Sequence, residues 1–276
     1  MNNVLLRAIS GTVFVLVMLA CLLFDKFLFA GMVVLIMVLM LVEFYRMTMG
    51  RSYRFSKFLA ILAGIFLFGI LFATSAYHLP MRFVALSMIP VFIVMVNSLY
   101  VEDKEEYGKL SNIYTGLLYI AVPLALSNLI AFDKSGNFSG LLLICFFVII
   151  WCGDVGAFAI GNALGKRFPK RLFPEVSPHK TWVGFVGGLV SSVLAAFLLY
   201  RFGILRFPLM HALILSVVMY IAGVYGDLYE SQWKRFYGVK DSGNIIPGHG
   251  GVLDRFDSTL MAMPFGAIYL AIFDLL

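Results

Sequence analysis

Long apolar runs separated by short polar segments make up most of this sequence. Nine runs can be placed to within a few residues: 5–24, 27–44, 58–77, 83–100, 113–131, 138–160, 182–200, 207–226 and 256–275. Each is close to the roughly 20 residues that a helix needs to cross a bilayer. The sequence therefore predicts an all-α, polytopic membrane protein with nine transmembrane helices.

Only Asp25 and Lys26 separate the first two runs. Two crossing helices are predicted there, and a re-entrant pair is the alternative. The first run follows a single basic residue, Arg7, and no small-residue cleavage site comes after it. We therefore expect a retained helix and not a signal peptide that is removed.

Composition supports a membrane protein and excludes several other classes. The chain is 62% hydrophobic and 13% charged, whereas a soluble domain carries about 25% charged residues. The net charge of +6 comes from loop cations that are expected to meet lipid headgroups and phosphates, not nucleic acid. Cys21, Cys145 and Cys152 lie in or beside apolar runs without a CxxC pair, which predicts inert thiols and no zinc site.

Basic residues are distributed unequally between alternate loops. If the N-terminus is cytoplasmic, the opposite side holds five of the 21 Lys and Arg residues, and the other 16 lie on the cytoplasmic side. The five are Lys26, Arg82, Lys134, Arg201 and Arg206. This bias predicts an odd number of helices and a cytoplasmic N-terminus in the cell inner or plasma membrane.

Polar residues are also distributed unequally between the two halves of the chain. Residues 1–150 are nearly featureless hydrophobic hairpins, whereas residues 151–276 contain two long polar loops on the predicted cytoplasmic side. We expect an N-terminal helical scaffold, 1–150, and a C-terminal catalytic half, 151–276, within one folded unit.

The second of these polar loops, residues 226–258, carries carboxylates at both ends. Asp227 closes one predicted helix, while Asp254 and Asp257 open the next. Residues three apart share a helix face, so the last two carboxylates can point the same way. Carboxylate oxygens are the ligands with which proteins usually hold Mg²⁺. This spacing suggests a metal site formed by Asp227, Asp254 and Asp257.

Cations and glycines accompany these carboxylates. The cations are Lys234, Arg235, Lys240 and Arg255, and the glycines are Gly248, Gly250 and Gly251. Glycines allow close approach of backbone N–H groups to a phosphate near a helix N-terminus. The combination is typical of a nucleotide-phosphate site. A loop that only sets topology is the alternative, but topology needs cations and not clustered aspartates and glycines.

The stretch from Ser231 to Asp257 also resembles a known signature. It reads Ser-Gln-Trp-Lys-Arg-x₄-Lys-Asp-x-Gly-x₂-Ile-Pro-x-His-Gly-Gly-Val-x-Asp-Arg-Phe-Asp and is similar to the signature of the phosphatidate cytidylyltransferases, also called CDP-diacylglycerol synthases. Trp233 stands where that family usually has a smaller aliphatic residue or Phe. The general layout is similar over essentially the whole chain, but only residues 151–258 carry specific motifs.

Two further segments support the resemblance. Asp154 to Arg167 is similar to the family's Asp…Gly…Gly-Lys/Arg stretch, and an aspartate inside an apolar run is by itself a functional candidate. The segment Ser177-Pro-His-Lys-Thr-Trp-Val-Gly184 is similar to the family's Ser-Pro-Lys-Lys-Thr-x-Glu-Gly. His179 and Val183 depart from that pattern, so a role of the family's Glu cannot be transferred, and Lys180 is the candidate for contacting a phosphate.

The resemblance implies transfer of CMP from CTP to phosphatidic acid, which gives CDP-diacylglycerol and pyrophosphate. It further implies Mg²⁺, a second cation such as K⁺, membrane lipids around the chain, and a homodimer. The implied catalytic residues are Asp154, Lys180, Asp227 and Asp254, and the metal ligands are these three aspartates with Asp257. The implied substrate-binding residues are Lys166, Arg167, Ser177, Lys180, Ser231, Lys234, Arg235, Lys240, Asp241, His249, Gly250, Gly251 and Arg255.

Alternative functions fit the sequence less well. A related enzyme could use another lipid phosphate, such as a polyprenol or ether-lipid phosphate. A transporter would gather its polar groups near the bilayer midplane, whereas here they gather at one predicted face. The Asp-Gly…Ala-Arg motif of CDP-alcohol phosphotransferases is not found.

Two polar or small-residue features outside these motifs have simpler interpretations. Glu43, beside a basic loop, is expected to be an interface anchor. Gly184 and Gly188 form a GxxxG pattern that predicts close helix packing.

Overall fold

The computed structural model describes residues 3–100, 107–246, 248 and 250–276, and most of them are helical. Each of the nine predicted runs coincides with a helical segment. The first four are α1 (Asn3–Phe24), α2 (Lys26–Met49), α3 (Arg54–Tyr77) and the 3₁₀ turn η1 (Met81–Ser87) with α4 (Met88–Ser98). The fifth contains η2 (Tyr107–Leu110), α5 (Ser111–Gly116), η3 (Leu117–Ala121) and α6 (Val122–Ala131). The others are α7 (Leu141–Leu164), α8 (Trp182–Arg201), α9 (Leu209–Phe236) and α10 (Leu253–Ile272).

Seven helical segments in the described part of the chain are long and apolar enough to cross a membrane. They are Lys26–Met49, Arg54–Tyr77, Met81–Ser98, Tyr107–Ala131, Leu141–Leu164, Trp182–Arg201 and Leu209–Phe236. The all-α, polytopic membrane fold is thus confirmed. Nine crossings, which would need α1 and α10 as well, and a cytoplasmic N-terminus stay predictions.

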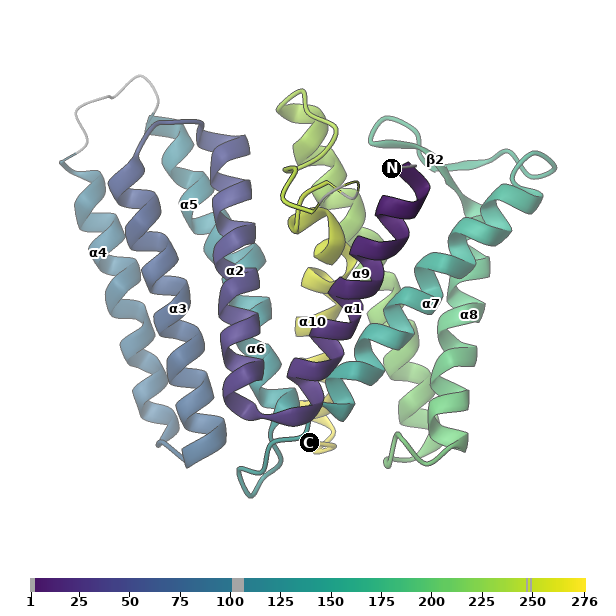
Figure 1. The fold of residues 1–276 in the computed structure, drawn as a ribbon, viewed down its shortest axis with the longest axis horizontal. Helices are drawn as coiled ribbons and strands as arrows, with labels where there is room; N and C mark the ends of the chain where they lie inside the picture. Colours follow the sequence, from purple (N-terminus) through teal and green to yellow (C-terminus); the bar gives the residue numbers. More distant parts are fainter. Residues whose placement is uncertain (1–2, 101–106, 247, 249) are drawn as a thin grey trace. The chain divides into compact units, whose positions relative to one another are not determined.

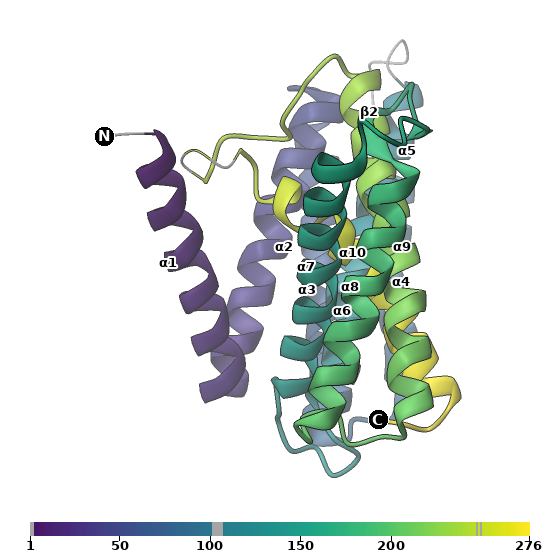
Figure 2. The ribbon, with the colours of Figure 1, turned by 90° about the vertical axis from the view of Figure 1, so that its right-hand side faces the viewer.

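The polar break between the first two runs is a helix cap. Asp25 is extended, and its Oδ1 accepts hydrogen bonds from the N–H groups of Phe27, at 2.7 Å, and Leu28, at 3.3 Å. A carboxylate in this position satisfies donors that the first turn of a helix leaves unpaired. This single residue therefore separates the two helices. Figure 2 shows that α1 and α2 diverge from this junction.

The chain divides into two compact units. The first unit is Met1–Gly140 with Tyr237–Arg255, and the second is Leu141–Phe236 with Phe256–Leu276. In the first unit α3 packs against α2, α4 and α6 (Figure 1). A cluster of aromatic rings fills this unit at one end, formed by Phe29, Phe68, Phe72, Phe132 and Phe138.

In the second unit α7, α8 and α9 pack side by side (Figures 1 and 2). A Cβ atom on Gly184 would lie 2.9 Å from the carbonyl oxygen of Ala157, and one on Gly188 would lie 2.7 Å from that of Gly153. Only glycine allows the backbones of α7 and α8 to come so close. The predicted packing role of the GxxxG pair is therefore confirmed.

Two local departures from the predicted pattern occur in the second unit. A small antiparallel hairpin, β1 (Arg171–Phe173) and β2 (Ser177–Thr181), lies between α7 and α8. The predicted end of the eighth helix near residue 226 is wrong, because α9 continues to Phe236. A helix that leaves the apolar layer needs no further apolar residues, and Glu230 and Lys234 support it as an i,i+4 pair.

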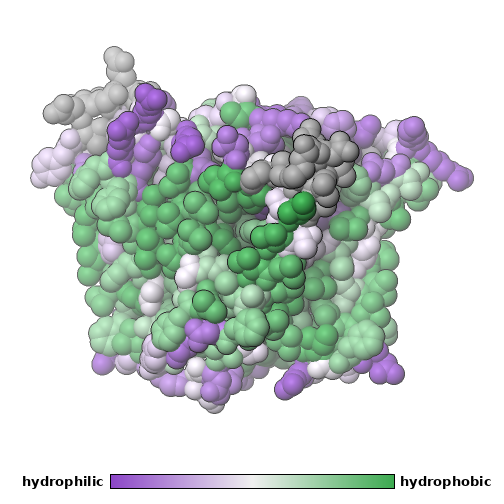
Figure 3. Space-filling view, viewed as in Figure 1, coloured by the Kyte–Doolittle hydropathy of each residue, from purple (hydrophilic) through white to green (hydrophobic). Residues whose placement is uncertain are grey.

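Large apolar side chains cover the outer surfaces of the helices. Leu35 is 59% exposed, Leu118 is 70% exposed and Phe158 is 71% exposed. Figure 3 shows apolar residues over the middle stretches of the helices and polar residues toward helix ends. Exposed apolar area of this extent needs a lipid environment, and the chain is an integral membrane protein.

Candidate active site

Three carboxylates of the second unit come from three different helices. Asp154 lies on α7, Asp227 on α9 and Asp257 on α10, and they are near enough to repel one another electrostatically. Ser258 Oγ donates to Asp154 Oδ1 at 3.5 Å, and Ser231 Oγ donates to Asp227 Oδ1 at 3.3 Å. Carboxylates that lie up to about a hundred residues apart in the sequence thus form one acidic cluster.

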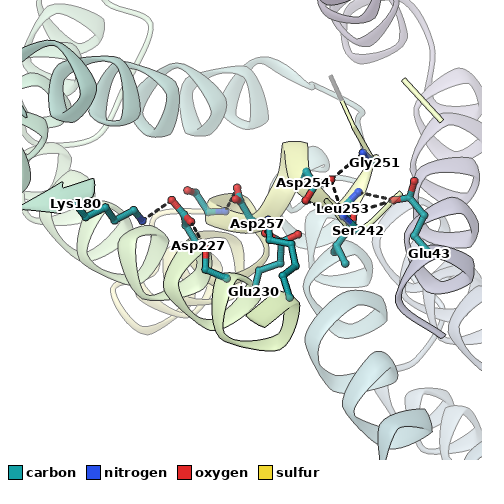
Figure 4. A network of polar contacts seen from close by, with 12 residues as sticks. Glu43, Lys180, Asp227, Glu230, Ser242, Gly251, Leu253, Asp254 and Asp257 are labelled. Carbon is teal, nitrogen blue, oxygen red and sulfur yellow. Dashed lines mark hydrogen bonds and ion pairs between the residues drawn. The ribbon is translucent and has the colours of Figure 1, made fainter. Parts of the chain in front are cut away.

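Lys180 places a positive charge in this cluster. It belongs to β2, directly before α8, and its Nζ forms an ion pair with Asp227 Oδ2 (Figure 4). The Lys180 side chain is 27% exposed and that of Asp227 is 28% exposed, so both remain within reach of a dissolved or membrane-bound substrate. The next residue, Thr181, caps α8 by accepting from the N–H of Gly184 at 3.1 Å, which fixes the place where Lys180 emerges.

A glycine brings two of the carboxylate-bearing helices together. Gly226 precedes Asp227 on α9, and a Cβ there would lie 2.5 Å from the backbone oxygen of Asp257 on α10. Any larger residue would push the helices apart. The close approach explains how Asp227 and Asp257 come to share a site.

Glu230 is a residue that the sequence interpretation missed. It is 1% exposed and forms an i,i+4 ion pair with Lys234 at 2.7 Å. The spacing Glu230–Lys234 could have revealed the pair, but only if the segment had been read as a helix. Lys234, predicted to bind substrate, is thus placed beside a buried carboxylate.

The first unit contains the other predicted aspartate, Asp254, in the first turn of α10. The Asp254 carboxylate accepts from the N–H of Ser242, at 3.0 Å to Oδ2, and from the N–H of Gly251, at 2.8 Å (Figure 4). It is 8% exposed. Asp254 therefore fixes the loop from which α10 begins.

Glu43 contacts the same loop. Its Oε2 accepts from the N–H of Leu253 at 2.9 Å and from Ser242 Oγ at 3.4 Å, as Figure 4 shows. The expectation of an interface anchor is wrong, because this side chain is 2% exposed and bonds to a loop some two hundred residues later.

The remaining predicted substrate-binding residues differ in exposure. Lys166, Arg167, Arg235, Lys240, Asp241 and Arg255 are exposed, Ser177, Ser231 and Gly250 are half-buried, and Gly251 is buried. Exposed cations near helix ends are free to reorient toward phosphates. His249 lies outside the residues that the structure describes.

The donor chemistry of the second unit fits Mg²⁺, but a complete set of ligands is not preformed. Over residues 3–100, 107–246, 248 and 250–276, no three His, Cys, Asp or Glu side chains are grouped closely enough to hold a metal ion. Mg²⁺ is usually bound by one or two carboxylates, with phosphate oxygens and waters completing its shell. Asp227 with Asp154 or Asp257 would supply the carboxylates, and a bound phosphate would supply further oxygens.

Comparison with known proteins shows the family to which the chain belongs. The model of the cytidylyltransferase family matches residues 5–273, nearly the whole chain. The chain is 39% identical over 189 residues to a phosphatidate cytidylyltransferase of Bacillus subtilis, which covers 68% of this chain and 66% of that protein.

Two further relatives show the same likeness over a shorter region. The chain is 44% identical over 126 residues to a phosphatidate cytidylyltransferase of Staphylococcus saprophyticus, covering 45% of this chain and 47% of the relative. It is 44% identical over 133 residues to one of Haemophilus influenzae, covering 46% and 45%. The chain thus spans between about half and two thirds of the length of these curated relatives.

Proposed function

Because the chain belongs to the cytidylyltransferase family, we propose that it transfers the cytidylyl group of CTP to phosphatidic acid, giving CDP-diacylglycerol and pyrophosphate. The observation that supports this most directly is the cluster of Asp154, Lys180, Asp227 and Asp257 in the second unit. It combines acidic groups suited to a metal with a cation suited to phosphate. We assign phosphatidic acid as the lipid substrate because the relatives are named phosphatidate cytidylyltransferases.

The proposed reaction exchanges one phosphorus–oxygen bond for another. A phosphate oxygen of phosphatidic acid attacks the α-phosphorus of CTP, and the bond from that phosphorus to the bridging oxygen breaks as pyrophosphate leaves. The attacking oxygen is already anionic near neutral pH, so the reaction needs no strong general base. The main barrier is the repulsion between two anionic substrates, and positioning with charge neutralisation lowers it.

Lys180 is the group that we assign to this neutralisation. Without substrate its ammonium pairs with Asp227, and a phosphate oxygen offers the same kind of acceptor. Arg235, Lys240 and Arg255, all exposed, are further cations that the resemblance assigns to the triphosphate or the phosphatidate headgroup. Lys234 stays beside Glu230, which keeps its charge in place.

We assign Mg²⁺ to Asp227 together with Asp154 or Asp257, with Asp254 and a second cation such as K⁺ as the further expectation from the resemblance. When bound, Mg²⁺ would offset phosphate charge as the pyrophosphate leaves. Lys180 would then give up its contact with Asp227 and turn to the substrate. His249 remains the candidate donor to the leaving pyrophosphate.

The proposed site faces the cytoplasm, where CTP is present, and the lipid enters sideways from the bilayer. The unequal distribution of Lys and Arg supports this orientation. A homodimer is proposed from the resemblance alone. The mass of the purified protein–detergent complex, corrected for bound detergent, tests it directly.

The decisive experiment measures the release of labelled pyrophosphate from γ-labelled CTP. Purified protein in detergent is given CTP with and without phosphatidic acid and Mg²⁺, and the lipid phase is analysed for CDP-diacylglycerol. Release that requires all three components supports the proposal. A polyprenol phosphate and an ether-lipid phosphate serve as competing acceptors, and faster transfer to either would change the assigned lipid. Folded protein that releases no pyrophosphate with any acceptor would refute the proposed activity.

A further inference from the structure

A buried carboxylate stands near the end of α2, a helix that is otherwise almost wholly apolar. Glu43 is 2% exposed, and α2 is among the segments suited to cross the membrane. Burial of an ionisable group in such a place costs free energy unless its oxygens are satisfied, and it usually marks a function. Neither the motifs in the sequence nor the proposed reaction accounts for Glu43.

The contacts of Glu43 show what the carboxylate holds. Leu253 is the first residue of α10, and its N–H is one of the donors that a helix cannot satisfy from within. Glu43 Oε2 accepts from this N–H at 2.9 Å. The side chain thus caps α10 from another helix, a task that usually falls to a residue directly before the helix.

The same oxygen ties down the preceding loop. Ser242 Oγ donates to Glu43 Oε2 at 3.4 Å, while the N–H of Ser242 donates to Asp254. One serine therefore links the two carboxylates, and Gly251 completes the link through its own N–H to Asp254 at 2.8 Å. Ser242, Gly251 and Leu253 are therefore all held by these two carboxylates.

The loop leaves no space around Glu43. A Cβ on Gly243 would lie 2.7 Å from Glu43 Cδ, and a Cβ on Gly251 would lie 2.7 Å from Glu43 Oε2. Both glycines therefore let the loop pack directly against the carboxylate. These two glycines belong to the signature, and their packing against Glu43, which is distant in the sequence, explains why small residues fit there.

The second oxygen argues against a purely stabilising role. Among the described residues, Glu43 Oε1 is buried and has no hydrogen-bond partner. A half-satisfied buried carboxylate is less favourable for stability than an apolar side chain of similar shape. A protein tolerates such a cost where the group serves its activity.

We propose that Glu43 is a positioning residue for the reaction, which fixes Ser242 and the first turn of α10, the helix that carries Arg255 and Asp257. The inference rests on the proposed cytidylyl transfer for its effect on rate. It does not require Glu43 to touch a substrate. Because misplacement by about 1 Å can cost up to a hundredfold in rate, loss of this cap should be visible in turnover.

The test compares Glu43→Met with Glu43→Gln in full-length protein in detergent. Glu43→Met keeps side-chain length but removes the acceptor, and we expect kcat to fall on the order of 10- to 100-fold. The KM for CTP should change much less, since the loss lies in alignment and not in uniform binding. Glu43→Gln retains an amide oxygen that can accept from Leu253, and it should restore kcat to within about fivefold of the parent.

A matched control separates alignment from general stability. Thr48 is also buried on α2, but its Oγ1 bonds only to the carbonyl oxygen of Phe44 in the same helix. Thr48→Val should leave kcat unchanged. If Glu43→Met lowers only the melting temperature while the folded enzyme keeps its kcat, Glu43 is structural and the inference fails. Equal loss in Glu43→Gln and Glu43→Met would also overturn it, because the charge and not the cap would then matter.

Amide hydrogen exchange provides a readout that does not depend on turnover. Glu43→Met should speed exchange at Leu253, Ser242 and Gly251, whereas Thr48→Val should not. Unchanged exchange in this loop would contradict the cap even if the activity proposed above were itself wrong. Active parent enzyme with an unaffected Glu43→Met variant would refute the positioning role alone.

Discussion

At the scale of single residues, the carboxylates divide into two kinds. Asp227 is partly exposed and pairs with Lys180, so its charge is available to a substrate or a metal. Asp254 and Glu43 are buried and accept hydrogen bonds from loop N–H groups. Asp227 and Asp254 thus have different surroundings, although the sequence pattern presents these two aspartates alike.

Asp227→Asn should lower kcat at least about a hundredfold, because a charged group near the transferred phosphate is lost. Protein yield and thermal stability should change little, since the Lys180–Asp227 pair is part-exposed and such pairs contribute at most about 1 kcal/mol. Initial rates at saturating Mg²⁺ provide the measurement. Glu175→Gln, an exposed acid in the turn between β1 and β2, is the control. A rate near that of the parent would remove Asp227 from the proposed site.

Asp254→Ala should destabilise the protein by about 1–3 kcal/mol, because the N–H groups of Ser242 and Gly251 lose their acceptor. Thermal unfolding in detergent, followed by circular dichroism, measures the change. Asp227→Ala is the comparison and should shift the transition much less. Equal shifts in both variants would show that the hydrogen bonds to Asp254 are not the source of stability.

At the scale of elements, helix ends and helix contacts decide where functional groups lie. Asp25 separates α1 from α2, Thr181 begins α8, and Glu43 caps α10. The first two caps are local and can be recognised in sequence, since each residue lies next to the helix it caps. The third links residues 43 and 253, and nothing in the local sequence signals it.

Gly226→Ala should impair both stability and turnover. The added methyl group would lie 2.5 Å from the backbone oxygen of Asp257, so α9 and α10 must separate. Overpacking of this kind costs about 1–3 kcal/mol, and the shift of Asp227 relative to Asp257 should reduce kcat on the order of tenfold or more. Steady-state kinetics and thermal unfolding of one preparation measure both effects.

Gly69→Ala is the matched control for that substitution. Gly69 lies in α3, and a Cβ there meets no atom within 4 Å. Alanine is the better helix former by about 0.5–1 kcal/mol, so this variant should be neutral or slightly stabilised. If Gly226→Ala behaved in the same way, close approach of the two helices would not be needed for activity.

At the scale of the whole molecule, the seven apolar helical segments found in the described part of the chain establish a membrane protein, while the distribution of cations predicts its orientation. The loop after α6 contains Lys134, and Glu175 lies on the predicted opposite side of the membrane. Lys134→Cys should react with an impermeant thiol reagent in intact cells, and Glu175→Cys should react only after permeabilisation. The reverse pattern would invert the topology and move the proposed site away from cytoplasmic CTP.

Several features were predictable from the sequence for physical reasons. Hydropathy is a sum over neighbouring residues, so it located the nine apolar runs. Asp154 was recognisable as an aspartate inside such a run, and helix spacing paired Asp254 with Asp257. Lys180 became a candidate through the family resemblance. The end of α9 was misplaced, because hydropathy marks the membrane boundary and not the helix end. Glu230 was overlooked for the same reason.

The sequence by itself determined the membrane class, the family likeness and the acids that carry the proposed chemistry. Only the tertiary structure showed which groups each acid contacts. It paired Lys180 with Asp227, placed Gly226 against Asp257, and brought Glu43 to the start of α10. The physical reason is that membrane partitioning depends on each segment alone, whereas a hydrogen bond or a close helix contact depends on two segments whose meeting is set by packing.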